Sequence, residues 1–228
     1  MKILLVDQDT ELSALLAFTL GQSGYECCMA SDRAGALEQL ERESPDLALL
    51  DHTSALDGIE LCGELRRRSR LPIMILNAHE REDDLLAAFD AGADDYLRKP
   101  FSPRVLVARV KGLLRRVDSA PVKVIAVGQV MLDVEEHALR IGSEGPVRLT
   151  PLEFTAIHLL LSTPGRTVTA ARMLTQLWGT DSGREQRMLK QLIYRLRQKI
   201  ELDPAAPRLI VTTPHAGYRF ETDGFVAS

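Results

Sequence analysis

The strongest constraint in the sequence is a short apolar run at residues 47–50 that ends on Asp51. A continuous apolar run of this length predicts a strand buried on both faces, as in parallel sheets covered by helices. In such sheets ligands bind beyond the carboxyl ends of the strands, so Asp51 lies where chemistry is expected. The run alone leaves an alternative open, because an acid at this place also suits the cap of a following helix.

Three further apolar runs, at residues 2–6, 72–76 and 96–97, are likewise followed by polar residues. Another strand is expected at residues 25–30, and apolar residues at helical spacing separate the runs. Strand and helix therefore alternate five times. This predicts an α/β fold with a doubly wound, five-stranded parallel sheet and right-handed crossovers.

The carboxyl ends of these strands would bring Asp7, Gln8, Asp51, Asn77 and Lys99 to one edge of the sheet. Neighbouring carboxylates repel unless a lysine or a divalent cation neutralises them, and Mg²⁺ prefers such oxygen ligands. An aspartate held against a metal can attack a phosphorus centre and carry the phosphoryl group. The pattern therefore indicates phosphoryl chemistry at Asp51.

Charge differs between the two halves of the chain. Residues 1–120 hold 15 basic and 21 acidic residues, whereas residues 121–228 hold 13 and 11. Within the second half, residues 184–199 contain six basic residues and one acid. A concentrated basic segment suggests a polyanion partner, although such a run is more often only a solvated helix face.

The second half also predicts a different fold. Residues 129–133 and 138–142 alternate as in a small antiparallel sheet. Thr150, Pro151 and Glu153 combine a capping box with a proline at the first helical position, so a helix is expected to begin there. The elements expected after it are helices at residues 169–178 and 184–200 and a hairpin of strands at residues 208–212 and 218–221.

The helix expected at residues 184–200 is amphipathic, with its apolar side chains on one buried face. Basic and amide side chains on the opposite face suit a DNA major groove, where they pair with guanine and adenine edges. The residues expected on this outward face are Lys190, Gln191, Tyr194, Arg195 and Gln198.

Residues 1–117 resemble the receiver domain of two-component response regulators. The resemblance rests on residues 3–7, 45–51 and 57–58 and, most specifically, on the segment GADDYLRKPF at residues 92–101. It implies that Asp51 is the phosphoacceptor, that Lys99 contacts the phosphoryl group and that Tyr96 is the switch aromatic. The implied pocket is Asp51, Lys99, Asn77 and Tyr96, with Asp7, Asp51 and Thr53 as ligands of a weakly bound Mg²⁺.

Three departures from the family pattern surround this pocket. Gln8 stands where a second acid usually binds the metal, Asn77 replaces the usual Ser or Thr, and the loop from Asp51 to Asp57 is one residue shorter. Fewer charged ligands weaken the affinity for a hard cation, and Asp9 lies one residue too far along to substitute. We therefore expect weak Mg²⁺ binding, little phosphorylation of Asp51 and DNA binding that is largely independent of it.

Residues 125–224 resemble the winged helix-turn-helix effector of the OmpR/PhoB family, through residues 149–154, 177–179, 196–200 and 217–220. The sequence therefore predicts a receiver domain at residues 1–117, a linker at 118–124 and an α+β winged helix-turn-helix domain at 125–228.

Within this domain Arg195 and Gln191 are expected to read bases, while Arg187, Arg197 and Lys199 hold phosphates. In the wing, Pro214 stands where the family often has an arginine, so His215 is a weaker substitute. The complete expected DNA-binding set is Arg187, Lys190, Gln191, Tyr194, Arg195, Arg197, Gln198, Lys199, Thr212 and His215.

The receiver also resembles its family in a face that forms homodimers through ion pairs. Two charges of one such pair are replaced together by Leu85 and Val105, which predicts an apolar contact and a dimer that persists without phosphate. The alternative is that both residues pack within their own domain. The ion pairs expected to remain across the dimer are Asp95 with Arg109 and Asp90 with Arg116.

Two kinds of function fit these patterns. The first is a DNA-binding transcription regulator that recognises a direct-repeat operator and works with RNA polymerase, with or without a sensor histidine kinase. The second is a phosphoryl carrier that relays phosphate from Asp51 and uses its second half to bind proteins. No enzymatic activity is expected beyond phosphoryl transfer at Asp51.

The place of the protein in the cell follows from two further features. Cys27, Cys28 and Cys62 form no CxxC pair, which fits a reducing compartment. No apolar run approaches the ~20 residues of a membrane span. A cytoplasmic protein is therefore expected.

Overall fold

The computed structural model describes residues 1–53, 56–78, 81–114, 124–179 and 183–221. The chain divides into two compact units, Met1–Arg115 and Arg116–Ser228. Most of the predicted linker lies outside the described residues, and Val124 already belongs to a strand, so the domain boundaries stay a prediction. None of the helices in the described ranges is long and apolar enough to cross a membrane.

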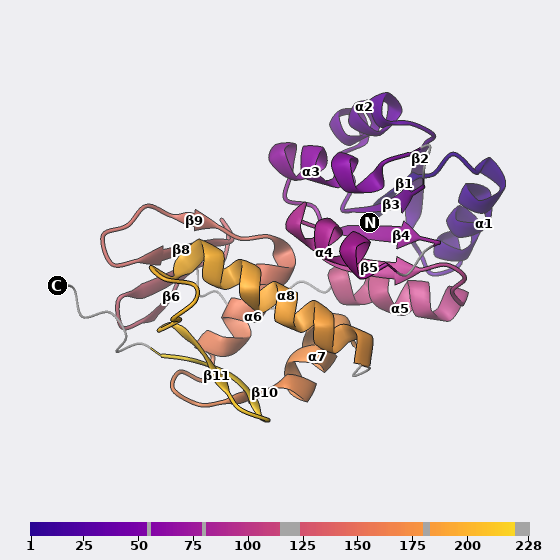
Figure 1. Ribbon diagram of the computed structural model, residues 1–228. Helices are drawn as coiled ribbons and strands as arrows, with labels where there is room; N and C mark the ends of the chain where they lie inside the picture. The colour runs from indigo at the N-terminus through magenta and orange to yellow at the C-terminus, as the bar shows by residue number, and fades with distance from the viewer. Residues whose placement is uncertain (54–55, 79–80, 115–123, 180–182, 222–228) are drawn as a thin grey trace. The chain divides into compact units, whose positions relative to one another are not determined.

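The first unit alternates strands and helices (Figure 1). Its elements are β1 (Lys2–Val6), α1 (Thr10–Gly21), β2 (Glu26–Ala30), α2 (Arg33–Glu43), β3 (Leu47–His52), α3 (Gly58–Arg68), β4 (Ile73–Asn77), α4 (Glu82–Asp90), β5 (Asp95–Arg98) and α5 (Pro103–Leu114). All neighbouring strands are parallel, in the order β2-β1-β3-β4-β5. The predicted doubly wound five-stranded sheet is thereby confirmed.

Helices cover both faces of this sheet. Leu16 and Leu20 of α1 and Leu106 and Val110 of α5 pack on one face against the odd-numbered apolar residues of β1 and β3. Helices α2, α3 and α4 lie on the other face (Figure 1). The burial of both faces explains why β3 and β4 are continuously apolar up to Asp51 and Asn77 near their carboxyl ends.

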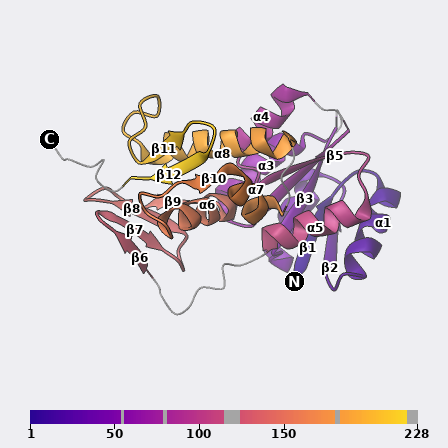
Figure 2. The same cartoon turned by 90° about the horizontal axis from the view of Figure 1, so that it is seen from below.

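The second unit begins with an antiparallel sheet and ends in a hairpin (Figure 2). Its elements are β6 (Val124–Val127), β7 (Val130–Asp133), β8 (Ala138–Ile141), β9 (Val147–Arg148), α6 (Pro151–Leu161), β10 (Val168–Thr169), α7 (Ala170–Trp178), α8 (Gly183–Ile200), β11 (Ile210–Thr213) and β12 (Gly217–Phe220). The first four strands form one sheet, and β10 joins the hairpin of β11 and β12 as a third strand. The helices and hairpin predicted for a winged helix-turn-helix domain are present.

Local signals set the helix starts in both units. Asp9 and Asp57 cap α1 and α3 by accepting hydrogen bonds from main-chain N–H groups of the first turn. The side chain of Thr150 accepts from the N–H of Glu153, while the Glu153 carboxylate accepts from the N–H of Thr150 at 2.9 Å. The predicted capping box at α6 is therefore confirmed.

Candidate functional site

The acidic pocket forms where β1, β3 and β5 end. Lys99, just beyond β5, extends its ammonium group between two carboxylates, 2.7 Å from Oδ1 of Asp51 and 3.0 Å from Oδ2 of Asp7. Both aspartates are buried, and about one-fifth of the Lys99 side chain is exposed. The sequence prediction that these side chains meet at one edge of the sheet is confirmed, and lysine supplies the positive charge.

Burial and the neighbouring Lys99 shift the pKa of the Asp51 carboxyl in opposite directions. Burial raises the pKa of Asp51, and the nearby Lys99 only partly offsets that effect. Burial alone would lower the pKa of Lys99, but its hydrogen bonds and charge interactions with Asp51 and Asp7 outweigh this and raise it. Lys99 therefore stays protonated as the cation of the pocket.

The donor set suits a divalent metal poorly. Gln8 is exposed and carries no charge, and the Asp9 carboxylate already accepts hydrogen bonds from the N–H groups of Glu11 and Leu12. In the described part of the chain, no three His, Cys, Asp or Glu side chains are grouped so as to hold a metal ion.

The shortened loop after β3 is held close to Asp51. The N–H of Thr53 donates to the carbonyl of Leu56 at 2.9 Å, and its hydroxyl accepts from the N–H of Leu56 at 3.1 Å. A Cβ atom at Gly58 would collide with the Asp51 carbonyl oxygen, so only glycine fits this close approach. Thr53 is exposed, and its expected role as a metal ligand stays a prediction.

The pocket continues into a hydrogen-bonded pair on β4 and β5. The Asn77 amide donates to the hydroxyl oxygen of Tyr96 at 2.7 Å and to a carboxylate oxygen of Asp84 on α4 at 3.3 Å. Asn77 and Tyr96 are both buried. The amide therefore links the aromatic side chain to α4, and Asp84 is a member of this site that the sequence analysis did not include.

The residues predicted to form the dimer face require corrections. Leu85 is only 8% exposed and packs inside its own domain, because the inward side of α4 runs through Leu85, Ala88 and Phe89. Val105, by contrast, is 43% exposed. The alternative, that these residues pack within their own domain, is therefore right for Leu85 and wrong for Val105.

The expected cross-subunit ion pairs also differ. Arg109 binds Asp95 of the same chain, with Nη1 at 2.9 Å from Oδ1, and both residues are buried. The pair thus forms within a single receiver, and its predicted role across a dimer stays a prediction. Arg116 lies outside the described residues, so its predicted pairing with the exposed Asp90 stays a prediction.

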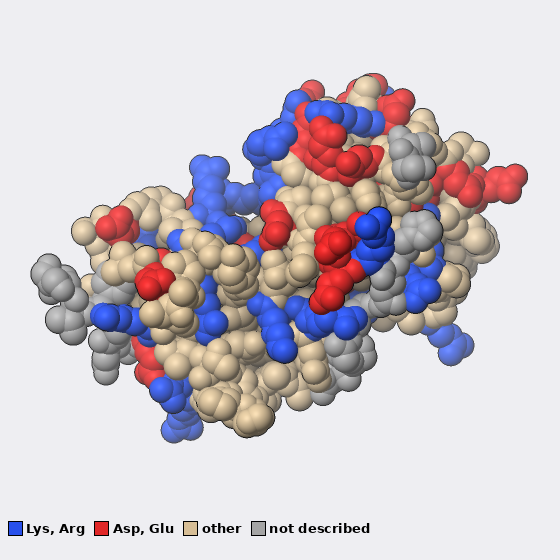
Figure 3. Space-filling model, in the orientation of Figure 1, with Lys and Arg blue, Asp and Glu red and all other residues tan. Residues whose placement is uncertain are grey.

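The outward face of α8 contains most of the side chains predicted to bind DNA. Arg187, Lys190, Tyr194 and Gln198 are exposed, and Gln191 is partly buried. Figure 3 shows basic side chains scattered over a largely uncharged surface along α8. The predicted buried face is also correct, because Leu189, Leu192, Ile193, Leu196 and Ile200 are all buried.

Arg195 is the main correction on α8. Its side chain is buried, 8% exposed, and its Nε lies 3.7 Å from Oε1 of Glu153 at the start of α6. Lys199 approaches the other oxygen of the same carboxylate at 2.6 Å. Glu153 is only 1% exposed, so this carboxylate joins α6 to the recognition helix. A base contact by Arg195 is therefore excluded in this arrangement, and Lys199 already has an acidic partner.

Arg197 likewise has partners within the domain. Its guanidinium donates to the carbonyl of Ile210 at 2.6 Å and to the hydroxyl of Thr212 at 2.9 Å. Burial lowers its pKa, although the side chain keeps its charge. These bonds attach the end of α8 to β11, the first strand of the wing. Arg197 therefore has a structural role here, and its guanidinium is not available to bind a DNA phosphate.

The wing itself is exposed. Thr212 on β11 and His215 at the turn between β11 and β12 both face solvent. His215 has a positive φ of 57°, and an added Cβ at the following Gly217 would collide with the Val168 carbonyl. The turn is therefore tightly determined, and it presents the His215 side chain at its tip.

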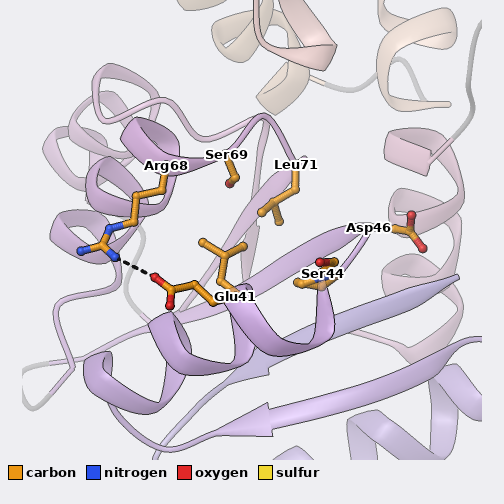
Figure 4. Close-up of a pocket in the computed structure, with 8 residues that line it drawn as sticks. Glu41, Ser44, Asp46, Arg68, Ser69 and Leu71 are labelled. Atoms are coloured by element: carbon orange, nitrogen blue, oxygen red, sulfur yellow. Dashed lines mark hydrogen bonds and ion pairs between the residues drawn. The ribbon is translucent and has the colours of Figure 1, made fainter.

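A separate cavity of about 740 Å³ lies at the opposite edge of the receiver sheet (Figure 4). Its charged groups are already engaged: Arg68 pairs with Glu41 at 3.3 Å, and the Asp46 carboxylate accepts from the N–H of Lys2 at 2.9 Å. The cavity is thus distinct from the acidic pocket and contributes nothing to it.

Comparison with known proteins agrees with both units. The family described as "Response regulator receiver domain" matches residues 3–111, and "Transcriptional regulatory protein, C terminal" matches residues 144–220. The sensory transduction protein RegX3 of Mycolicibacterium smegmatis is 36% identical over 225 residues, which cover 96% of this chain and 98% of RegX3. The probable transcriptional regulator ycf27 of Porphyridium aerugineum is 38% identical over 230 residues, which cover 96% of this chain and 95% of ycf27.

Among solved structures, the response regulator DrrB of Thermotoga maritima, an OmpR/PhoB homologue, is similar over 96% of this chain and 98% of its own. Its TM-score is 0.51 at 27% sequence identity. The similarity spans the receiver unit, with its acidic pocket, and the winged unit, with its basic helix. The chain therefore belongs to the OmpR/PhoB family of DNA-binding response regulators.

Proposed function

We propose that this regulator binds duplex DNA in a manner largely independent of phosphorylation, because Lys99 fills the role of the cation in its receiver. The observation that carries the proposal is the ammonium group of Lys99 between Asp7 and Asp51, at 3.0 and 2.7 Å. The ammonium group offsets one of the two carboxylate charges there, while the exposed Gln8 adds no negative charge to attract a metal.

The hydrogen bond between Asn77 and Tyr96 supports the same proposal. It holds the switch aromatic inside the domain through an amide that does not depend on a phosphoryl group at Asp51. Because the same amide reaches Asp84, we expect the position of α4 to follow Tyr96 rather than modification of Asp51. Weak Mg²⁺ binding and little phosphorylation are the expected consequences.

The DNA contacts that we propose lie on α8 and the wing. With Arg195 and Lys199 paired to Glu153 and Arg197 bound to the wing, the remaining candidates are exposed or partly exposed. They are Arg187, Lys190, Gln191, Tyr194, Gln198, Thr212 and His215.

The test uses a duplex enriched from a random pool by the full-length protein. Its affinity is measured by fluorescence anisotropy before and after incubation with Mg²⁺ and acetyl phosphate. We expect little change, and we expect Asp51→Ala to retain the wild-type affinity. A large gain on incubation, or a large loss in Asp51→Ala, would contradict the proposal.

A conventional phosphorylation-switched regulator is the second candidate. The observation in its favour is that Asp51 and Lys99 keep the close pairing expected of a phosphoacceptor and its lysine. In that case a sensor histidine kinase would supply the phosphoryl group, and DNA affinity would rise with modification of Asp51.

The remaining partners are proposals as well. We propose RNA polymerase as a partner and a cytoplasmic location. For a homodimer through α4, β5 and α5, the exposed apolar residues are Val105 and Leu86, since Leu85 is buried. The outward face of α8 argues against a purely protein-binding second half, because Arg187 and Lys190 are exposed there among polar side chains.

A further inference from the structure

Tyr194 is an exposed aromatic residue at the centre of the recognition helix. Its side chain is 53% exposed, although tyrosine rings in folded proteins are usually largely covered. Lys190 lies four residues before it and Gln198 four residues after it, so the three side chains share one face of α8. The ring is therefore flanked by two polar, exposed groups and is left uncovered by the domain.

This face carries no exposed acid among the described side chains of α8. Glu185 is the acidic residue of the helix, and it is buried. Arg187 lies seven residues before Tyr194, two helical turns away on the same side, and adds a second exposed cation. An aromatic ring beside two cations that can reach phosphates would face the edges of the base pairs.

The chemistry of the groove limits what such a ring can recognise. The thymine C5-methyl is the apolar group among the base edges of the major groove, and aromatic or aliphatic side chains make apolar contacts with it. Arg195, which would otherwise be the candidate for reading a base beside this ring, is buried against Glu153. We propose that Tyr194 determines part of the sequence specificity by packing its ring on the methyl group of a thymine.

This inference rests on the proposed insertion of α8 into the major groove. Replacing thymine by deoxyuridine removes the methyl group and leaves base pairing unchanged. Losing the burial of one methyl-sized group should weaken binding about fourfold. The loss should depend on the ring of Tyr194 and not on its hydroxyl.

The experiment starts from the duplex enriched from a random pool by the full-length protein. Each thymine is replaced by deoxyuridine, one position at a time, and affinities are measured by fluorescence anisotropy for wild type, Tyr194→Ala and Tyr194→Phe. Arg187→Ala is the matched control on the same face, because it should weaken thymine and deoxyuridine duplexes by the same factor. Thermal unfolding checks that each variant remains folded.

We expect one deoxyuridine position to lower the affinity of the wild type and of Tyr194→Phe about fourfold, and to have no effect on Tyr194→Ala. If every position has the same effect on wild type and Tyr194→Ala, or if Tyr194→Phe loses the discrimination, the inference is overturned while DNA binding by α8 stands. If the wild type enriches no sequence at all, the proposed function fails and this inference fails with it.

Discussion

Replacing Glu153 by glutamine should destabilise the second unit strongly, because this buried carboxylate holds two cations of the recognition helix. Removing one partner of a buried ion pair typically costs ~3–5 kcal/mol. Two features reduce that value here: more than a third of the Lys199 side chain is exposed, and a glutamine oxygen can still accept from the N–H of Thr150. We therefore expect the free energy of unfolding to fall by ~2–3 kcal/mol.

The assay can use the single tryptophan of the chain. Trp178 is buried in α7, so its fluorescence reports unfolding of the second unit. In urea, Glu153→Gln should lower the midpoint without changing the slope of the transition. The matched control is Glu144→Gln at an exposed position, which should stay within ~0.5 kcal/mol of wild type. A change in Glu153→Gln no larger than this control would refute the idea that the carboxylate anchors α8.

Three further predictions concern single residues. Arg187→Ala should weaken binding to all duplexes alike and reduce the slope of log affinity against log salt by ~0.9, and an unchanged slope would exclude a phosphate contact. The pKa of Lys99 is raised above 10.5, so its stabilisation of the fold is complete below that pH and is lost as the pH rises through the folded-state pKa. The difference in unfolding free energy between wild type and Lys99→Ala should therefore shrink at alkaline pH, and a constant difference would argue against the ion pairs. Leu85→Lys should lower the unfolding free energy by more than ~2 kcal/mol, since it buries a charge; near-wild-type thermal stability with altered sedimentation would instead restore Leu85 as a surface contact.

The receiver sheet was predictable because its central strands are buried on both faces and are followed by polar residues. The same pattern predicts the pocket, and Lys99 does reach both Asp7 and Asp51. Strands β9 and β10, which the sequence did not predict, have two residues each, which is too short for a periodic signal. Strand β6 begins at Val124, the last residue of the predicted linker, and was not predicted either.

The wrong predictions at the candidate sites have a common cause. Helical periodicity predicts which way a side chain points, but it does not predict which residue that side chain binds. Arg195 lies at the margin of the polar face, and the acid that turns it inward is Glu153 on α6, far away in the sequence. Leu85 and Leu86 are adjacent, and only packing against the sheet decides that the first is buried and the second exposed. The sequence predicted Glu153 as a capping residue, but it did not predict its ion pairs with Arg195 and Lys199.

The most direct test of the central claim is the intact mass of the full-length protein after incubation with Mg²⁺ and acetyl phosphate. We expect the wild type to keep its unmodified mass, because Lys99 serves as the cation of the pocket and Gln8 lacks the carboxylate that would bind a metal. Gln8→Asp should gain one phosphoryl group. Stoichiometric modification of the wild type that disappears in Asp51→Ala would contradict the account.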